Sequence, residues 1–135
     1  MDPINPLYLS TFLDLGPDWS EQPKEFAIIS AYATTGEKWS AERNQQADKR
    51  LYERLVREKT WLRRVTGYAP DTDHNEPCWA VSMSFTEACD LGEEFLQDAI
   101  YYVEGDQLYV SHCDSRRAKT SISKLSVKIR PMGKK

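Results

Sequence analysis

The chain has 135 residues, of which 40% are hydrophobic and 29% are charged, a composition typical of one globular domain. No segment approaches the roughly 20 consecutive apolar residues of a membrane-spanning helix, so we expect no membrane contact. The first ten residues, MDPINPLYLS, have prolines and an aspartate where a secretion signal would be basic, which predicts a cytoplasmic protein.

Charge is distributed unevenly along the chain, whose formal net charge is −3. Residues 116–135 contain eight basic residues and no acidic one, whereas residues 1–115 contain ten basic and 21 acidic residues. The sequence therefore predicts an acidic body with a basic tail. Two interpretations of the tail are open: it lies against the acidic body, or it binds nucleic acid or an acidic protein.

The first part of the chain is expected to contain two helices with a strand between them. Residues 5–14 are typical of a short helix, and the apolar, β-branched and aromatic run 25–33 predicts a strand that is covered on both faces. Ser40 is placed to cap a helix that runs to about Lys59. The predicted inward side of this helix consists of Ala47, Leu51 and Leu55.

A strip of arginines follows a neighbouring side of this second helix. Its members recur at spacings of seven, four and three residues and are Arg43, Arg50, Arg54 and Arg57. Such spacings place the guanidinium groups on one strip of helix surface. We predict partner binding through this strip and through Arg116 and Arg117 of the tail. The alternative is a solvated face that nearby glutamates partly neutralise.

The middle of the chain is expected to form two strands and a further helix. Strands are predicted at 60–68, with a bend at its one glycine, and at 78–83. Ser84 and Glu87 form a Ser-x-x-Glu capping box, which predicts a helix that runs to about residue 97. The predicted inward side of this helix consists of Ala88, Leu91, Gly92 and Phe95, with the glycine allowing close approach to the sheet.

Residues 99–113 carry the signal of a β-hairpin. Gly105 and Asp106 form a two-residue loop, and glycine in its first position favours a type II′ turn. This turn pairs Tyr102 with Tyr109 and places both on a face that is either covered or a binding platform. The opposite, core-facing side is predicted to hold Tyr101, Val103, Leu108 and Val110.

The tail is expected to add a last edge strand bordered by lysines. Its alternating apolar positions are Leu125, Val127 and Ile129. Together the predicted elements describe an α/β (α+β) fold, a single-domain sandwich of a mixed sheet with five or six strands and two or three helices, in the order (α)βαββαββ. We divide it into an N-terminal helix and loop (1–24), a core α/β domain (25–113) and a basic C-terminal tail (114–135).

Residues that could bind a metal or act as nucleophiles are few. The candidate metal ligands are His74, Cys78, His112 and Cys113. Because adjacent strand residues point to opposite faces, His112 and Cys113 would not serve one ion, and we predict no metal site. A nucleophilic Cys78 would need His74 as its base and Glu76 to orient it, but no glycine-rich anion cradle lies beside them. Three cysteines without C-x-x-C spacing also predict reduced thiols.

Sequence motifs of the common nucleotide-binding and hydrolytic classes are missing. The chain has no phosphate loop, no Gly-x-Gly-x-x-Gly and no Gly-x-Ser-x-Gly. Adjacent carboxylates such as Glu93 and Glu94 are interpreted as solubilising groups of an acidic body. We therefore predict no cofactor.

Four stretches carry a resemblance to a known family: AIISAYA (27–33), SAERN (40–44), NEPCWAV (75–81) and ACDLGEEFLQDAIYYVEGDQLYV (88–110). Over residues 25–117 they resemble the bacterial domain-of-unknown-function family numbered 3293. The resemblance implies a cytoplasmic α/β domain of bacteria or their mobile elements and brings no established activity. This chain departs from the family pattern with Ala33-Thr34 in place of Asn-Pro and with Cys78 in place of serine. A position normally filled by a small hydroxyl indicates a half-buried strand residue, not a nucleophile.

Polar positions shared with the family pattern supply a candidate ligand site. They are Asn44, Glu76 and Gln97, with Tyr32 at the aromatic place. The predicted order of elements would bring them to one rim of the sheet, where polar groups could bind a ligand. The alternative is that Asn44 and Gln97 satisfy backbone groups.

These observations favour a small non-enzymatic binding or regulatory protein that acts through its arginine strip, basic tail or acidic body. We expect a protein partner, with nucleic acid as an alternative. A phage or mobile-element accessory protein that inhibits a host defence system would fit, since a compact acidic body can mimic nucleic acid. The competing interpretation is an enzyme or ligand-binding domain that uses the Tyr32, Asn44, Glu76 and Gln97 rim on a nucleotide-like or small polar substrate.

Overall fold

The computed structural model describes residues 6–33, 38–57, 61–69 and 75–130. Within these residues the chain forms one eight-stranded sheet in the order β7-β6-β5-β2-β4-β3-β1-β8. The strands are β1 (Phe12–Leu15), β2 (Glu25–Ile29), β3 (Leu62–Tyr68), β4 (Asn75–Val81), β5 (Ala99–Glu104), β6 (Gln107–His112), β7 (Thr120–Lys124) and β8 (Ile129–Arg130). The helices are α1 (Pro6–Ser10), α2 (Ala41–Val56), α3 (Phe85–Glu94) and α4 (Leu125–Lys128). The α/β class is confirmed, with more strands and helices than predicted.

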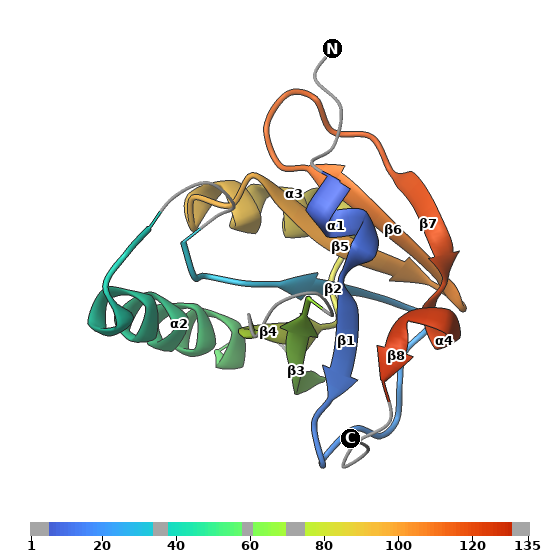
Figure 1. Ribbon diagram of the computed structural model, residues 1–135, viewed down its shortest axis with the longest axis horizontal. Coiled ribbons are helices and arrows are strands. Elements are labelled where there is room, and N and C mark those ends of the chain that lie inside the picture. The colour runs from blue at the N-terminus through green and yellow to red at the C-terminus, as the bar shows by residue number, and fades with distance from the viewer. Residues whose placement is uncertain (1–5, 34–37, 58–60, 70–74, 131–135) are drawn as a thin grey trace.

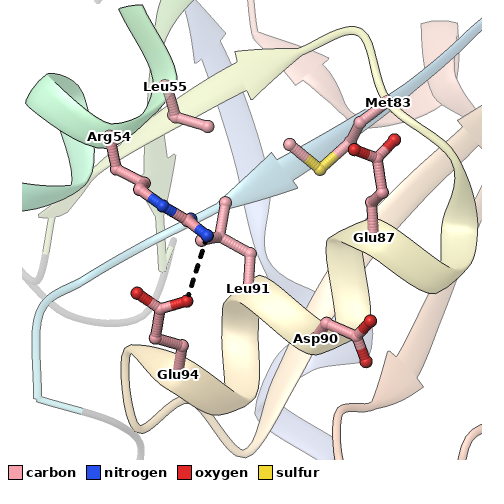
Figure 2. Close-up of a pocket in the computed structure, with 7 residues that line it drawn as sticks. All are labelled: Arg54, Leu55, Met83, Glu87, Asp90, Leu91 and Glu94. Carbon is pink, nitrogen blue, oxygen red and sulfur yellow. Dashed lines mark ion pairs between the residues drawn. The ribbon is translucent and has the colours of Figure 1, made fainter. Parts of the chain in front are cut away.

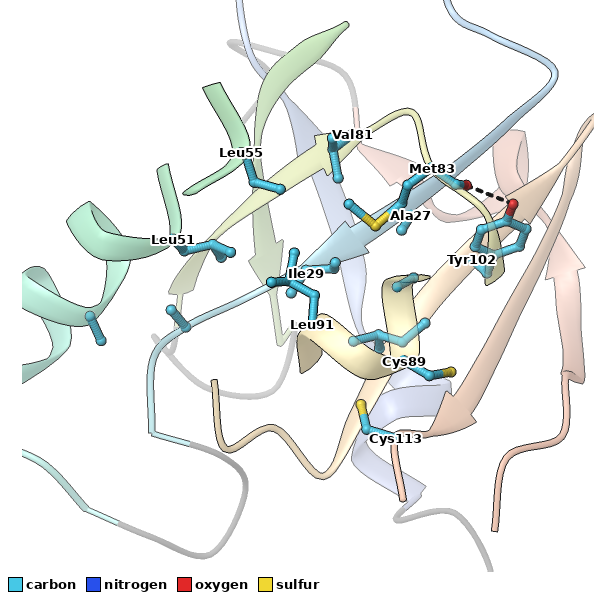
Figure 3. Close-up of a cluster of buried hydrophobic side chains, with 14 residues drawn as sticks. Ala27, Ile29, Leu51, Leu55, Val81, Met83, Cys89, Leu91, Tyr102 and Cys113 are labelled. Atoms are coloured by element: carbon cyan, nitrogen blue, oxygen red, sulfur yellow. Dashed lines mark hydrogen bonds between the residues drawn. The ribbon is translucent and has the colours of Figure 1, made fainter. Parts of the chain in front are cut away.

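The sheet is curled, so its two faces are covered differently (Figure 1). Neighbouring strands are antiparallel except β1 and β8, which are parallel. An outer core lies between the sheet and the helices α2 and α3 and is drawn in Figure 3; its members are Ala27, Ile29, Ala31, Ala47, Leu51, Leu55, Val81, Met83, Ala88, Cys89, Leu91, Ile100, Tyr102 and Cys113. An inner core fills the hollow of the curl; its members are Leu13, Phe26, Ile28, Trp61, Val65, Cys78, Ala80, Ala99, Tyr101, Val103, Leu108, Val110 and Leu125.

Strand β2 contributes to both cores, which explains its almost continuous apolar sequence. Phe26 and Ile28 point into the inner core, whereas Ala27 and Ile29 point into the outer core. The prediction of a strand covered on both faces is confirmed. The regular strand ends at Ile29, four residues before the predicted end.

The two long helices begin as the sequence predicts. The Ser40 hydroxyl accepts the Arg43 backbone N–H at 3.1 Å, and the buried residues of α2 are Ala47, Leu51 and Leu55, as expected. The Ser84–Glu87 capping box that starts α3 is also confirmed. The predicted end of α2 near Lys59 lies outside the described residues.

The end of α3 is set by its backbone and not by its apolar pattern. Leu96 adopts a positive φ of 62°, and the Gln97 backbone N–H bonds to the Gly92 carbonyl at 2.8 Å. This is the geometry of a Schellman C-cap, in which the positive-φ residue is usually glycine. The helix therefore ends at Glu94, three residues earlier than predicted, and leaves the Leu96 side chain 60% exposed.

The hairpin of β5 and β6 has the predicted register. Tyr101 pairs with Val110, Tyr102 with Tyr109 and Val103 with Leu108. Gly105 has a φ of 62°. Tyr102 is buried in the outer core with Phe85 packed edge-on against its ring, so this face of the hairpin is covered and is not an open platform.

One predicted element was wrong, and a second was misplaced. Residues 5–14 do not form one helix, because α1 ends at Ser10 and residues 12–15 form β1. Long-range pairing explains the difference: Phe12 lies opposite Tyr68 of β3, and Leu13 is buried in the inner core. Local apolar spacing gave no sign of that partner strand.

The tail does supply edge strands, β7 and β8, but the alternating apolar residues that we assigned to one strand do not form it. Residues 125–128 form the short helix α4, in which Leu125 is buried and Val127 is exposed. The hairpin turn holds this helix: the Asp106 carbonyl accepts the Leu125 N–H at 2.6 Å, and its carboxylate accepts the Ser126 N–H. On either side of α4, β7 lies at one edge of the sheet and β8 at the other.

Two details of the middle strands also differ from the prediction. β4 begins at Asn75, three residues earlier than expected, because it pairs with β3 along its whole length. Gly67 lies opposite Glu76 in regular register and makes no bend.

Candidate functional site

A groove runs between α2 and α3 on the outer side of the molecule (Figure 2). Its volume is about 180 Å³, and the residues that line it are Arg54, Leu55, Met83, Glu87, Asp90, Leu91 and Glu94. Leu55, Met83 and Leu91 belong to the outer core, so they form an apolar floor. The charged side chains stand at the rim.

Helical spacing explains why the acidic side chains line one side of the groove. Glu87, Asp90 and Glu94 are three and four residues apart on α3, which places them on one face over two turns. Leu91 lies on the adjoining, buried side of the same helix. Arg54 enters from α2, where it is the neighbour of the inward-facing Leu55.

The groove has an excess of negative charge, with three carboxylates against one guanidinium in its lining. Arg54 Nη2 lies 3.4 Å from Glu94 Oε1, and these two side chains are 43% and 52% exposed. Asp90 is paired with Arg117 of the tail, whose Nη1 lies 2.8 Å from its Oδ1. The pairing with Asp90 raises the pKa of Arg117.

The start of the basic tail lies against the acidic body. Arg117 also approaches Glu93 and donates from Nε to the Cys113 carbonyl at 2.7 Å. Arg116 bonds to Asp114 at 2.8 Å and approaches Asp98. The hydrogen bonds from Arg116 lower the pKa of Asp114 to about 2. Both tail arginines that we predicted to bind a partner are thus engaged within the chain.

The four arginines of the strip on α2 have different surroundings. The Arg43 guanidinium stacks on the Trp39 ring at 3.8 Å from its centroid. Arg50 and Arg57 are exposed on the helix surface. Of the four arginines of the strip, Arg54 lines the α2–α3 groove.

Three of the four predicted rim residues meet where the chain leaves β2. The Asn44 Oδ1 accepts the Ala33 backbone N–H at 2.8 Å, and the Gln97 Nε2 donates to the Tyr32 carbonyl at 2.7 Å. These bonds tie the exit of β2 to α2 and to the end of α3. Glu76 precedes Cys78 by two residues, so it points to the inner side of the sheet, away from the other three. Ligand binding by this rim stays a prediction.

The three cysteines are buried, and the sheet separates Cys78 from the other two. Cys78 belongs to the inner core, whereas Cys89 and Cys113 belong to the outer core. Burial raises the pKa of all three thiols, and that of Cys113 rises to about 12. At neutral pH they are protonated and poor nucleophiles. His74, the base that a nucleophilic Cys78 would need, lies outside the described residues. Among the described residues, no group of three or more His, Cys, Asp or Glu side chains could hold a metal.

Sequence reasoning missed the acidic side of the groove. The carboxylates of α3 were interpreted as solubilising, because acidic residues are frequent throughout the chain. A usable signal was their spacing, since Glu87, Asp90 and Glu94 recur at helical intervals beside the apolar Leu91. The packing of α3 beside α2 had no sequence signal.

Comparisons with known proteins agree with the sequence resemblance. The family model described as Protein of unknown function (DUF3293) matches residues 29–100, more than half of the chain. No curated protein and no solved structure matches the chain. None of the helices in the described part of the chain has the length and hydropathy of a membrane-spanning segment.

Proposed function

This chain belongs to the DUF3293 family, and we propose that it is a binding protein whose α2–α3 groove receives a positively charged side chain of a partner protein. The observation that carries this proposal is the pairing of an apolar floor with a rim of three carboxylates. Arginine and lysine have the matching shape, an aliphatic stem with a cationic head.

The size of the groove supports a single side chain as its occupant. At about 180 Å³ it is smaller than the roughly 300–1,000 Å³ of sites for drug-sized ligands. Leu55 and Leu91 would contact the stem, and the flexible thioether of Met83 can adjust to it. Glu94 and Glu87 would then hold the charged head by charge-assisted hydrogen bonds, since Asp90 is already paired with Arg117.

The charges favour a protein partner over nucleic acid. The acidic face of α3 would repel a phosphate backbone. Arg116 and Arg117, which could otherwise bind phosphates, are engaged with carboxylates of the same chain. Binding is also better supported than catalysis, because Asn44 and Gln97 of the alternative enzymatic rim are bonded to backbone groups.

The test is an NMR titration of the isotope-labelled protein with a short blocked peptide that has one arginine between glycines. We expect amide shifts to concentrate on α3 and the last turn of α2. A peptide with citrulline in place of arginine has nearly the same shape without the charge and should bind far more weakly. Equal binding of both peptides, or shifts confined to another surface, would contradict the proposal.

Matched glutamate variants sharpen this test. Glu87→Gln should weaken the arginine peptide about threefold, because one carboxylate of the lining loses its charge while glutamine can still close the capping box. Glu53→Gln makes the same change of charge on the exposed surface of α2, away from the groove, and should leave the affinity nearly unchanged. A titration with single-stranded DNA serves as the comparison for nucleic acid.

The biological role predicted from the sequence, inhibition of a host defence system, is a separate proposal. It is supported by the acidic body, and it would be tested by expressing the chain in bacteria with and without a defence system and measuring phage plating. Equal plating in both strains would count against it.

A further inference from the structure

We propose that Arg54 is a built-in competitor for the α2–α3 groove. Its guanidinium holds the contact with Glu94 that a partner's cationic head would take, so this ion pair has to open on binding, although the groove itself has room for the side chain. This inference rests on the proposed function, since it describes how the same groove is regulated.

In the part of the chain that the structure describes, Arg54 and Arg117 contact acidic side chains of α3, and they are held very differently. Arg117 bonds to Asp90 at 2.8 Å, approaches Glu93 and donates to the Cys113 carbonyl, and its side chain is 25% exposed. Arg54 approaches Glu94 at 3.4 Å and its side chain is 43% exposed. Among the described residues, three contacts fix the first arginine, whereas the second has one long ion pair and is the easier to displace.

Figure 2 shows the path of Arg54 across the groove. The side chain leaves α2 beside Leu55 and reaches toward Glu94 on α3. Its head therefore pairs with one of the three carboxylates of the lining. In the free protein, Arg54 makes the kind of contact that we propose for the partner.

Displacement of Arg54 would make the groove selective. A neutral or acidic side chain offers nothing to replace the ion pair with Glu94, so it would not displace Arg54 from that contact. A cationic side chain exchanges one ion pair for another and gains contact with the apolar floor. Competition thus lowers affinity for every ligand but penalises uncharged ligands more.

The experiment compares two arginine variants one helical turn apart. Arg54→Gln removes the competitor, and Arg50→Gln makes the same change of net charge at an exposed position of α2 that does not line the groove. The probe is the arginine peptide, titrated by NMR against each variant and the unmodified protein. We expect Arg54→Gln to bind it about threefold to fivefold more tightly, the size of a lost surface ion pair, and Arg50→Gln to differ little from the unmodified protein.

A double variant tests whether the competition acts through Glu94. In a Glu94→Gln background, Arg54→Gln should give no further gain, because the contact that it relieves is already gone. Equal gains from Arg54→Gln and Arg50→Gln, or no gain from Arg54→Gln in a protein that binds the peptide, would overturn the competitor role and leave the groove as the binding site. Failure of every form to bind the peptide would overturn the proposed function, and this inference with it.

Discussion

Two neighbouring tyrosines of β5 lie on opposite faces of the sheet and belong to different cores. The hydroxyl of Tyr102 points into the outer core and donates to the Met83 carbonyl at 2.9 Å, just before α3 begins. The hydroxyl of Tyr101 points into the inner core and donates to the Tyr8 carbonyl of α1 at 2.7 Å, 93 residues away in sequence. Adjacent residues thus contact a carbonyl 19 residues away in sequence on one side of the sheet and one 93 residues away on the other.

The covers of the two cores differ in the same way. Two capped helices cover the outer core, and each depends on sequence signals within its own first turn. The inner core is closed by α1, α4 and the segment before β2. Hydrogen bonds to residues that are distant in sequence hold these segments in place. Examples are Trp61 Nε1 to the Ser20 carbonyl and Lys128 Nζ to the Leu9 carbonyl, both at 2.7 Å. The covers of the outer core therefore begin at locally specified points, whereas those of the inner core depend on contacts between distant residues.

The largest expected loss of stability comes from a cavity in the inner core. Phe26 is fully buried, and its ring lies 5.7 Å from that of Trp19 and 5.2 Å from that of Trp61. Phe26→Ala should lower the free energy of unfolding by about 3–5 kcal/mol, measured by urea denaturation followed by circular dichroism. Phe26→Leu keeps most of the side-chain volume and should lower the free energy of unfolding much less. Similar losses from both variants would show that volume at this position does not matter.

The next largest expected loss comes from a steric clash in the outer core. A Cβ at position 92 would lie 2.5 Å from Cys113 Sγ and 2.8 Å from Ile100 Cγ2, so Gly92→Ala forces α3 away from the sheet. We expect a loss of about 1–3 kcal/mol in urea denaturation, despite the better helix propensity of alanine. Adding Cys113→Ala should recover part of it. A Gly92→Ala protein that is more stable than the unmodified chain would mean that propensity outweighs the clash.

Replacing each tyrosine by phenylalanine sharpens the comparison directly. Tyr102→Phe should lower global stability by about 1–2 kcal/mol, because it leaves the buried Met83 carbonyl without this donor. Tyr101→Phe should cost about 1 kcal/mol and act mainly by loosening α1. Amide hydrogen exchange separates the two outcomes. Faster exchange throughout the outer core in Tyr101→Phe would contradict the independence of the two covers.

The smallest expected effect concerns the attachment of the tail. Asp114 has its pKa lowered from an ordinary 3.8 to about 2 by hydrogen bonds from Arg116. A carboxyl with a lowered folded pKa stabilises the fold above its unfolded pKa and loses that contribution as pH falls through the folded one. The difference in urea midpoint between the unmodified protein and Asp114→Asn should therefore shrink between about pH 4 and pH 2. A difference that is constant over this range would exclude Asp114 as the cause.

The local features of the outer side could be predicted from sequence because their causes lie within a few residues. Ser40, the Ser84–Glu87 box and the Gly105 turn each satisfy or shape backbone a few positions away. The inner side could not be predicted in this way. β1 depends on pairing with β3, and α4 depends on Asp106 of a turn about 20 residues earlier.

The candidate site was predictable only in part, for the same reason. Arg54 was identified from its place in the arginine strip, whereas its contact with Glu94 depends on how α2 and α3 pack together. Asn44 and Gln97 were identified as polar positions near β2, and the structure adds that both bond to the backbone beside Tyr32.

Leu96 offers a practical handle on this protein. A leucine with a φ of 62° and a mostly exposed side chain adds strain without filling either core. Glycine adopts that conformation freely, so Leu96→Gly should raise the melting temperature modestly. Weakened variants such as Phe26→Ala could then be purified and studied in this reinforced background.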